Sequence, residues 1–294
     1  MDRGSCAEHG YRMSQHFPSS KKLVLGSMKL GKLFLWGLCA LLLSLGAFAL
    51  AVFWGLPDVS TLKSRVNTLT ISVPDWQGAM HPFQVGPANP YWTPLESFPD
   101  ELKWTVIVAE DANFYEHDGV DMTALKEALK YDLKHKRMRY GASTITQQLA
   151  KNLFLSRDKS VLRKLRELVL ATRMERELTK GRILELYLNV VELGPLVYGF
   201  GHAADYHFGM PVAYLTPAEA AFLAATLPGP RVAFNPRNKL IKVRRRAARL
   251  IKLLALRNIL DETEVNDALV QIGQLDGRQD ARDEKAQAPD LSEY

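Results

Sequence analysis

Residues 104–121 read WTVIVAEDANFYEHDGVD, an apolar run that ends at two adjacent carboxylates, Glu110 and Asp111. A carboxylate at the edge of a buried segment is partly desolvated, which raises its pKa toward the range that a general acid or base needs. The pair on its own also fits ordinary solvent-facing acids at the end of a helix or in a turn. The stretch therefore poses both a structural and a chemical question.

The structural question concerns residues 104–110. The β-branched residues of TVIVA favour a buried strand. Helical signals dominate from residue 100 to about 260, so the neighbourhood favours a helix instead. We expect a helix, and the strand remains the open alternative.

The segment from Leu33 to Leu56 carries no charge between Lys32 and Asp58. As a helix it would be roughly 36 Å long, enough to cross a hydrocarbon core of about 30 Å. The tail before it, residues 1–32, is basic, which predicts a cytoplasmic N-terminus and an external remainder. A cleaved signal peptide is the alternative, because AFA and ALA at 47–51 resemble cleavage sites. We favour the anchor, since the apolar run continues past them.

Composition adds the expected surroundings of the external part. The chain has 294 residues, a net charge of +6 and two cysteines, one in the tail and one within the apolar segment. No disulfide framework therefore supports the external part. Residues 33–260 are net positive, which favours anionic partners such as phospholipid head groups or phosphate-bearing substrates. Nucleic acid is not expected outside a membrane.

Turn and helix signals divide the rest of the chain into three parts. Residues 57–99 are rich in Pro and Gly and predict a linker with a short strand or two. Residues 100–260 predict a mainly helical domain, with helix starts at Asp121 or Thr123, at Thr144, at Ser160 and at Pro217. Residues 261–294 are acidic, with ten acids against three basic residues, and we expect them to be disordered.

Two of these predicted helices carry polar faces. After Ser160, the residues Arg163, Glu167, Ala171 and Met174 line up nearly opposite a stripe of leucines, which indicates that the helix borders a second, partly enclosed space. After Thr144, two amides and Lys151 share one side. A helix start, amides and a lysine suit an anionic phosphate group, although polar residues on the wet side of a helix are common.

The basic segment KVRRRAARLIK, residues 242–252, has two readings. It could lie on an anionic membrane surface. We favour an amphipathic helix that closes the domain with its basic face in water.

The order of four motif blocks is more specific than any single block. EDANFYEHDGVD, GASTITQQLAKNLFL, RKLRELVLA and KGRILELYLNVVELGPLVYG follow one another along the chain. This series resembles the peptidoglycan glycosyltransferases of family 51, over about residues 90–255. Too little chain follows for a transpeptidase domain, so the chain resembles the monofunctional biosynthetic peptidoglycan transglycosylases. The resemblance implies a mainly α, lysozyme-like domain with a small membrane-associated jaw, here about residues 122–140.

The resemblance also implies roles for individual residues. Glu110 matches the general base that deprotonates the 4-hydroxyl of the acceptor sugar, and Glu167 matches the second essential carboxylate. Asp111 matches a supporting neighbour. The remaining positions match the donor site and the cations that hold the departing pyrophosphate: Ser143, Thr144, Gln147, Gln148, Lys151, Lys159, Arg163, Lys164 and Arg166.

The implied reaction is polymerisation of lipid II into β-1,4 glycan strands, with inversion at the anomeric carbon and release of undecaprenyl pyrophosphate. The resemblance implies no required cofactor and leaves room for a divalent cation, Mg²⁺ or Mn²⁺. Implied partners are lipid II, the growing strand, the bacterial inner membrane and other cell-wall synthesis or division proteins. The catalytic domain would be periplasmic on a single-pass anchor.

Two alternatives and one departure accompany this expectation. A lytic muramidase also uses a glutamate in a cleft but has no pyrophosphate to bind. A non-catalytic membrane-anchored scaffold is the third reading. After Tyr198-Gly199 the chain has Gly201-His202 in place of the usual acidic-then-small pair, and His207 in place of an aromatic residue.

Overall fold

The computed structural model describes residues 20–75, 77–135, 143–156, 158 and 160–276. The chain divides into two compact units, Met1–Trp54 and Gly55–Tyr294. The first contains α1, Ser20–Phe53. Its stretch Lys32–Phe53 is long and apolar enough to cross a membrane, which fits a membrane anchor.

The second unit begins with a short 3-10 helix, Val59–Lys63, followed by the hairpin that the linker composition predicts. Strands β1, Leu69–Pro74, and β2, Met80–Val85, pair antiparallel with Leu69 opposite Val85 and Pro74 opposite Met80. A second small ladder joins β3, Glu192–Gly194, to β4, Val197–Tyr198. Within the described residues the strands are confined to these two ladders, so the fold is mainly α, as predicted.

Residues 100–110 form a helix, α2 (Asp100–Glu110), in spite of their β-branched composition. Its first turn carries two acids, which suit the positive end of the helix dipole. Leu102, Val106 and Ile107 are at most 1 % exposed, and the helix packs against α8 and α9. Tertiary burial thus decides the conformation over intrinsic propensity.

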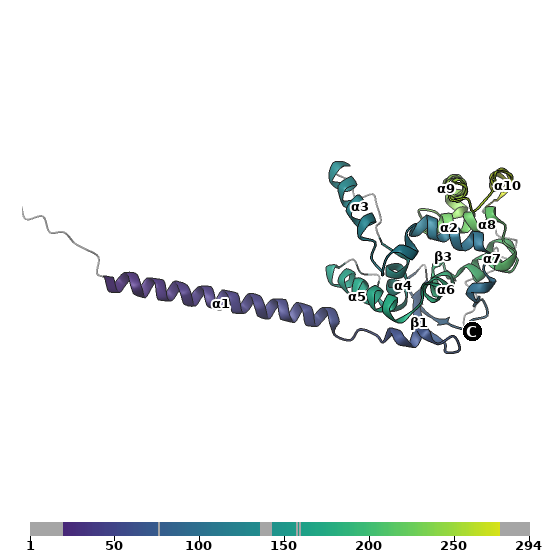
Figure 1. Cartoon of the computed structure of the whole chain (residues 1–294). Coiled ribbons are helices and arrows are strands. Elements are labelled where there is room, and N and C mark those ends of the chain that lie inside the picture. Colours follow the sequence, from purple (N-terminus) through teal and green to yellow (C-terminus); the bar gives the residue numbers. More distant parts are fainter. Residues whose placement is uncertain (1–19, 76, 136–142, 157, 159, 277–294) are drawn as a thin grey trace, which may run out of the picture. The chain divides into compact units, whose positions relative to one another are not determined.

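The remaining helices of the second unit pack around one core (Figure 1). Several of them begin at the residues that the sequence signals predict. Thr144 caps α4 and Ser160 caps α5. The Asp121 side chain accepts hydrogen bonds from the first backbone N–H groups of α3. Pro217 occupies the first turn of α8. The helices are α3 (Met122–His135), α4 (Ile145–Phe154), α5 (Val161–Glu177), α6 (Lys180–Val190), α7 (Phe200–Phe208), α8 (Pro217–Thr226), α9 (Pro236–Leu256) and α10 (Glu262–Gln274).

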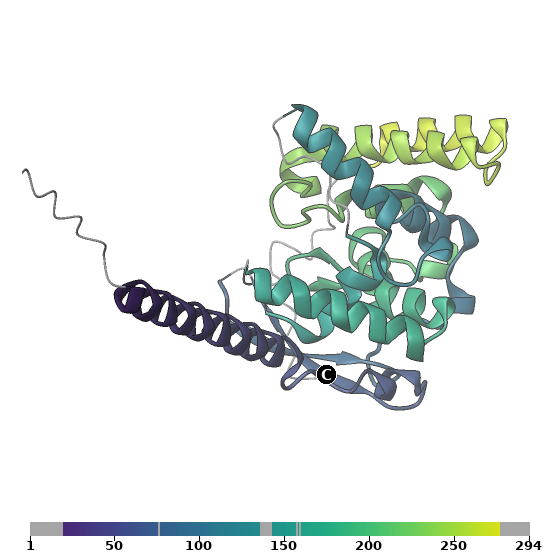
Figure 2. The same ribbon diagram turned by 60° about the vertical axis from the view of Figure 1, so that its left-hand side comes forward.

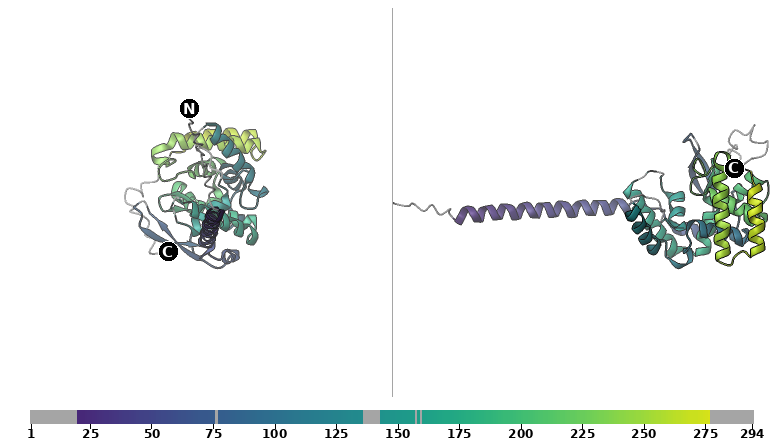
Figure 3. Two further views of the ribbon diagram at one scale, coloured as in Figure 1. Left: turned by 90° about the vertical axis from the view of Figure 1, so that its left-hand side faces the viewer. Right: turned by 90° about the horizontal axis from the view of Figure 1, so that it is seen from above.

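Helix α8 forms the centre of the helical packing. Every residue from Ala218 to Thr226 is buried, and the helix contacts α2, α9 and α10. A helix that is apolar on all sides needs partners all round, which these neighbours supply. Helices α9 and α10 lie side by side over it (Figures 2 and 3).

Helix α10 corrects one expectation. Disorder is predicted for residues 261–294, yet Glu262–Gln274 is helical, with Asp261 and Glu264 forming a capping box. Ala268 and Ile272 are 3 % exposed and join the core. The acidic composition of this segment reflects the exposed side of the helix, while the apolar stripe that packs against the core is only two residues wide in the described structure, Ala268 and Ile272. Residues 277–294, and residues 136–140 of the predicted jaw, lie outside the described residues.

Candidate active site

Glu110 is the last residue of α2, and its side chain is 12 % exposed. Nε2 of Gln148 donates a hydrogen bond of 3.0 Å to its Oε2 atom, and Nη2 of Arg246 lies 3.2 Å from its Oε1 atom. Burial raises the pKa of Glu110, while Gln148, Arg246 and Lys151 oppose that rise. The direction is the one predicted for a carboxylate at the edge of the core.

Tyr187 fixes the orientation of the amide that faces Glu110. Its hydroxyl donates a 3.0 Å hydrogen bond to Oε1 of Gln148. Because the amide oxygen is occupied by this donor, the NH₂ group of Gln148 is directed to the carboxylate. Tyr187 is fully buried in α6, and burial raises the pKa of its hydroxyl well above the ordinary value, so it remains a donor. Side chains from α4, α6 and α9 thus surround the end of α2 at Glu110.

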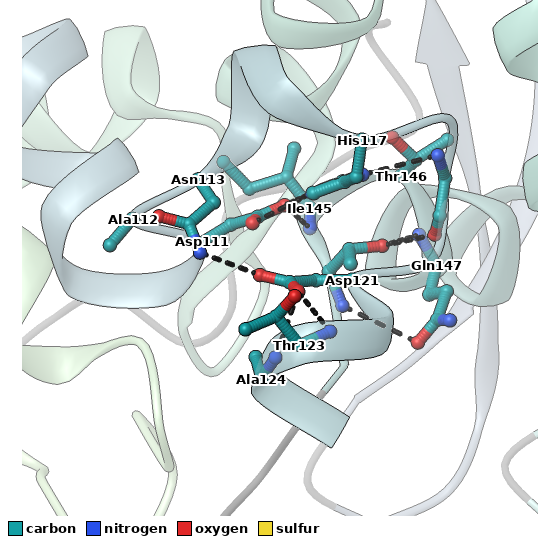
Figure 4. A network of polar contacts seen from close by, with 12 residues as sticks. Asp111, Ala112, Asn113, His117, Asp121, Thr123, Ala124, Ile145, Thr146 and Gln147 are labelled. Carbon is teal, nitrogen blue, oxygen red and sulfur yellow. Dashed lines mark hydrogen bonds and ion pairs between the residues drawn. The ribbon is translucent and has the colours of Figure 1, made fainter. Parts of the chain in front are cut away.

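Asp111 has different partners from its neighbour (Figure 4). Its Oδ2 atom accepts a 2.9 Å hydrogen bond from the backbone N–H of Ile145, at the start of α4, and Nε2 of His117 lies 2.9 Å from Oδ1. The N–H of Gly119 donates to Nδ1 of His117, which leaves the ring proton on Nε2, facing the carboxylate. Asp111 therefore ties the loop after α2 to the first turn of α4.

The start of α4 is held by the residues predicted for the donor site. Thr144 and Gln147 form a complete capping box, and the Thr144 hydroxyl donates to the Gly119 carbonyl at 2.7 Å. Both side chains are 2 % exposed. Ser143 and Gln147 also accept from Nζ of Lys164, at 3.0 and 3.4 Å. The capping contacts orient this block toward α5.

Glu167 lies on the buried face of α5 and is 3 % exposed. Nη1 of Arg163 lies 2.6 Å from its Oε2 atom, and Lys164 forms an ion pair with its Oε1 atom. Ala171 and Met174 on the same face are also fully buried, so this face of α5 packs into the core. Two cations on one carboxylate leave a net positive group at the start of the helix.

The other predicted cations lie close in sequence to this group. Lys151 is exposed in the last turn of α4, and Arg166 is half-buried on α5. Lys159 lies outside the described residues. Helix α4 links the two carboxylates, since Gln148 contacts Glu110 and Gln147 contacts Lys164, the partner of Glu167.

A separate hollow lies between the β1–β2 hairpin and α7, beside Gly201 and His202. Its lining includes Phe83, Tyr91, Tyr198 and His202. A Cβ atom on Gly201 would overlap the carbonyl oxygen of Tyr91, so glycine is required there. The His202 ring stacks on that of Tyr91, with 4.3 Å between centroids. Gly201 and His202 thus pack directly against the segment around Tyr91.

The comparison with known proteins decides the family. The family model for transglycosylases matches residues 79–255, more than half of the chain. The chain belongs to the transglycosylase family. Its relatives include the biosynthetic peptidoglycan transglycosylase of Aeromonas hydrophila subsp. hydrophila, 44 % identical over 195 residues, which cover 65 % of this chain and 80 % of the relative. That of Nitrosomonas eutropha is 40 % identical over 199 residues, 67 % and 81 % of the two chains.

A longer relative matches over one part of its length only. Penicillin-binding protein 1A of Neisseria lactamica is 39 % identical over 228 residues, which cover 77 % of this chain and 28 % of that protein. Membership of the transglycosylase family makes the chain a glycosyltransferase of peptidoglycan synthesis. This confirms the predicted enzyme class and disfavours the muramidase and scaffold readings.

The sequence does not predict a place in the site for three residues, Tyr187, His117 and Arg246. Tyr187 and His117 lie inside the quoted motif blocks without a distinguishing local signal. Arg246 is one of three consecutive arginines in the basic segment of α9, and nothing in the sequence separates it from Arg244 and Arg245. His117 contacts Asp111 within the same loop, Tyr187 reaches Glu110 only through Gln148, and Arg246 contacts Glu110 from a helix far along the chain.

Proposed function

We propose that this transglycosylase polymerises lipid II into β-1,4 glycan strands and releases undecaprenyl pyrophosphate. The observation that carries the proposal is the contrast between the two carboxylates. Glu110 is a partly buried carboxylate whose pKa is raised by burial, whereas Glu167 is ion-paired with two cations and forms a net positive group with them. A base and an anion-binding group are the two parts that this reaction requires.

Glu110 is the proposed general base. It accepts the proton of the acceptor's 4-hydroxyl as that oxygen attacks the anomeric carbon of the donor. The new C–O bond forms on the face opposite the pyrophosphate, and the bond to pyrophosphate breaks with its electron pair. One displacement converts an α linkage into a β linkage, so no covalent enzyme intermediate is required.

Arg163 and Lys164 are proposed to stabilise the departing pyrophosphate, with Lys151, Lys159 and Arg166 as further cations. Glu167 holds the first two in place through its ion pairs. Ser143 and Gln147 contact Lys164 and extend this arrangement to the start of α4. Charged donors near a developing pyrophosphate charge are worth more in a partly buried cleft than in water.

The lipid nature of the substrate accounts for the apolar helix α1. We infer that α1 anchors the chain in the bacterial inner membrane, with the N-terminus in the cytoplasm and the catalytic unit in the periplasm. The basic tail supports this orientation. An undecaprenyl chain remains in the bilayer, so an anchored enzyme meets its substrate by lateral diffusion.

The test is to incubate the detergent-solubilised full chain with labelled lipid II and, separately, with finished glycan strands. We expect polymer with β-1,4 linkages and one undecaprenyl pyrophosphate released for each bond formed. Shortening of finished strands, without use of lipid II, would identify a muramidase and overturn the proposal. Absence of both reactions in folded protein would also count against it.

A further inference from the structure

Helix α9 places one arginine of its basic run, Arg246, against the end of α2. Arg245, Arg249 and Lys252 are exposed, whereas the Arg246 side chain is 26 % exposed. Val243, Ala247 and Leu250 bury the opposite side of the helix against the core. The predicted basic face in water is therefore present, and Arg246 departs from it.

The Arg246 guanidinium is held by groups from two other parts of the fold. Nη2 lies 3.2 Å from Oε1 of Glu110 and 3.4 Å from the Ala109 carbonyl oxygen. The guanidinium carbon lies 5.7 Å from the centre of the Phe234 ring, a cation–π distance. Its Nε atom is buried and has no hydrogen-bond partner in the described part of the chain.

From this geometry we propose that Arg246 is a positioning residue for Glu110. Arg246 contacts Oε1 and Gln148 contacts Oε2, so each carboxylate oxygen has one fixed partner and keeps lone-pair capacity for an incoming hydroxyl. The two contacts come from different helices, α9 and α4, and together they restrict rotation of the carboxylate. The inference rests on the proposed role of Glu110 as base.

The charges facing Glu110 give the expected direction of a pH effect. Arg246 on α9 and Lys151 on α4 favour its ionised form, while burial and the neighbouring Asp111 favour the neutral form. Tyr187 on α6 remains a neutral donor. The base is active when ionised, so the rate falls as pH drops through its pKa. Loss of the Arg246 charge raises that pKa and moves the fall to higher pH.

The experiment compares Arg246→Gln and Arg246→Lys with Arg245→Gln, an exposed neighbour on the same helix. Polymerisation of lipid II is measured across a range of pH and of substrate concentration, beside the melting temperature. For Arg246→Gln we expect kcat to fall by about 10-fold or more with KM little changed, because the loss concerns alignment of a general base. Its acid limb should also move to higher pH.

Arg246→Lys separates charge from geometry. Lysine keeps the charge but lacks the planar fork of arginine. We expect its acid limb to return close to that of the wild type while kcat stays reduced. If Arg246→Gln does not fold, this variant carries the test through its lowered kcat. A folded Arg246→Gln variant with the kcat and pH profile of Arg245→Gln would overturn the inference, as would an unaltered Arg246→Lys variant.

A parallel Glu110→Gln variant distinguishes failure of the positioning role of Arg246 from failure of the base role of Glu110. If Glu110→Gln is inactive and Arg246→Gln is normal, the positioning role fails and the proposed function stands. If Glu110→Gln polymerises normally, Glu110 is not the base, and the inference falls with that assignment.

Discussion

The amide of Gln148 lies between the Tyr187 hydroxyl and the Glu110 carboxylate, with hydrogen bonds of 3.0 Å on both sides. Tyr187 is the group that decides which end of the amide faces the carboxylate. Tyr187→Phe keeps the buried ring and removes that donor. We expect kcat to fall by several-fold and stability by about 1 kcal/mol, the usual net worth of one hydrogen bond.

Polymerisation kinetics and urea unfolding measure these two effects. Tyr214→Phe, at a tyrosine that is 74 % exposed, is the matched control. An unchanged kcat in Tyr187→Phe would show that the orientation of Gln148 does not depend on the hydroxyl.

Asp111 should contribute mainly to stability. Asp111→Asn places an NH₂ or a neutral oxygen where the carboxylate accepts from Ile145 and pairs with His117. Because the side chains of Asp111 and His117 are nearly buried, we expect Asp111→Asn to lower the free energy of unfolding by about 2 kcal/mol. Asp118→Asn, at an exposed position in the same loop, should change it little. Equal unfolding curves for the two variants would remove the structural role of Asp111.

The buried imidazole of His207 should lower the free energy of unfolding at acidic pH. Burial lowers the pKa of its imidazole to about 4, from an ordinary value of 6.5. Between these two pH values the unfolded chain binds a proton that the folded chain does not, so stability is present above pH 6.5 and declines as pH falls toward 4. The full contribution is up to about 3 kcal/mol.

His207→Phe removes this contribution. The variant should lose less stability than the wild type between pH 7 and pH 4, measured by urea unfolding at each pH. The exposed His135 provides the control substitution, His135→Phe. Parallel pH curves for wild type and His207→Phe would contradict the prediction.

Local sequence signals predicted most of the fold because helix starts depend on neighbouring residues. Thr144, Ser160 and Pro217 stand where capping rules place them. The conformation of residues 104–110 depends on packing against α8 and α9, which lie more than a hundred residues later, so the sequence left helix and strand open. Helix α10 is stabilised by a tertiary contact in the same way. Only two of its side chains are buried, so its acidic composition outweighs its apolar content and favours a prediction of disorder.

The same distinction applies to the site. Glu110 and Glu167 stand in recognisable motif blocks, whereas the Arg246 contact joins positions that are distant in sequence. In the segment around Arg246 every turn of α9 carries a cation, and only the packed helix shows which one contacts Glu110. The catalytic and binding roles of all the site residues, Glu110 and Glu167 included, stay predictions.

The most direct test of the central claim is the rate of lipid II polymerisation by Glu110→Gln, beside the wild type and Glu116→Gln, an exposed acid in the following loop. Glutamine keeps the shape of the side chain but cannot accept the proton of the 4-hydroxyl. The account predicts a loss of about 100-fold or more for Glu110→Gln, in the range of general-base catalysis, and a normal rate for Glu116→Gln. A folded Glu110→Gln variant that polymerises lipid II at the wild-type rate would contradict it.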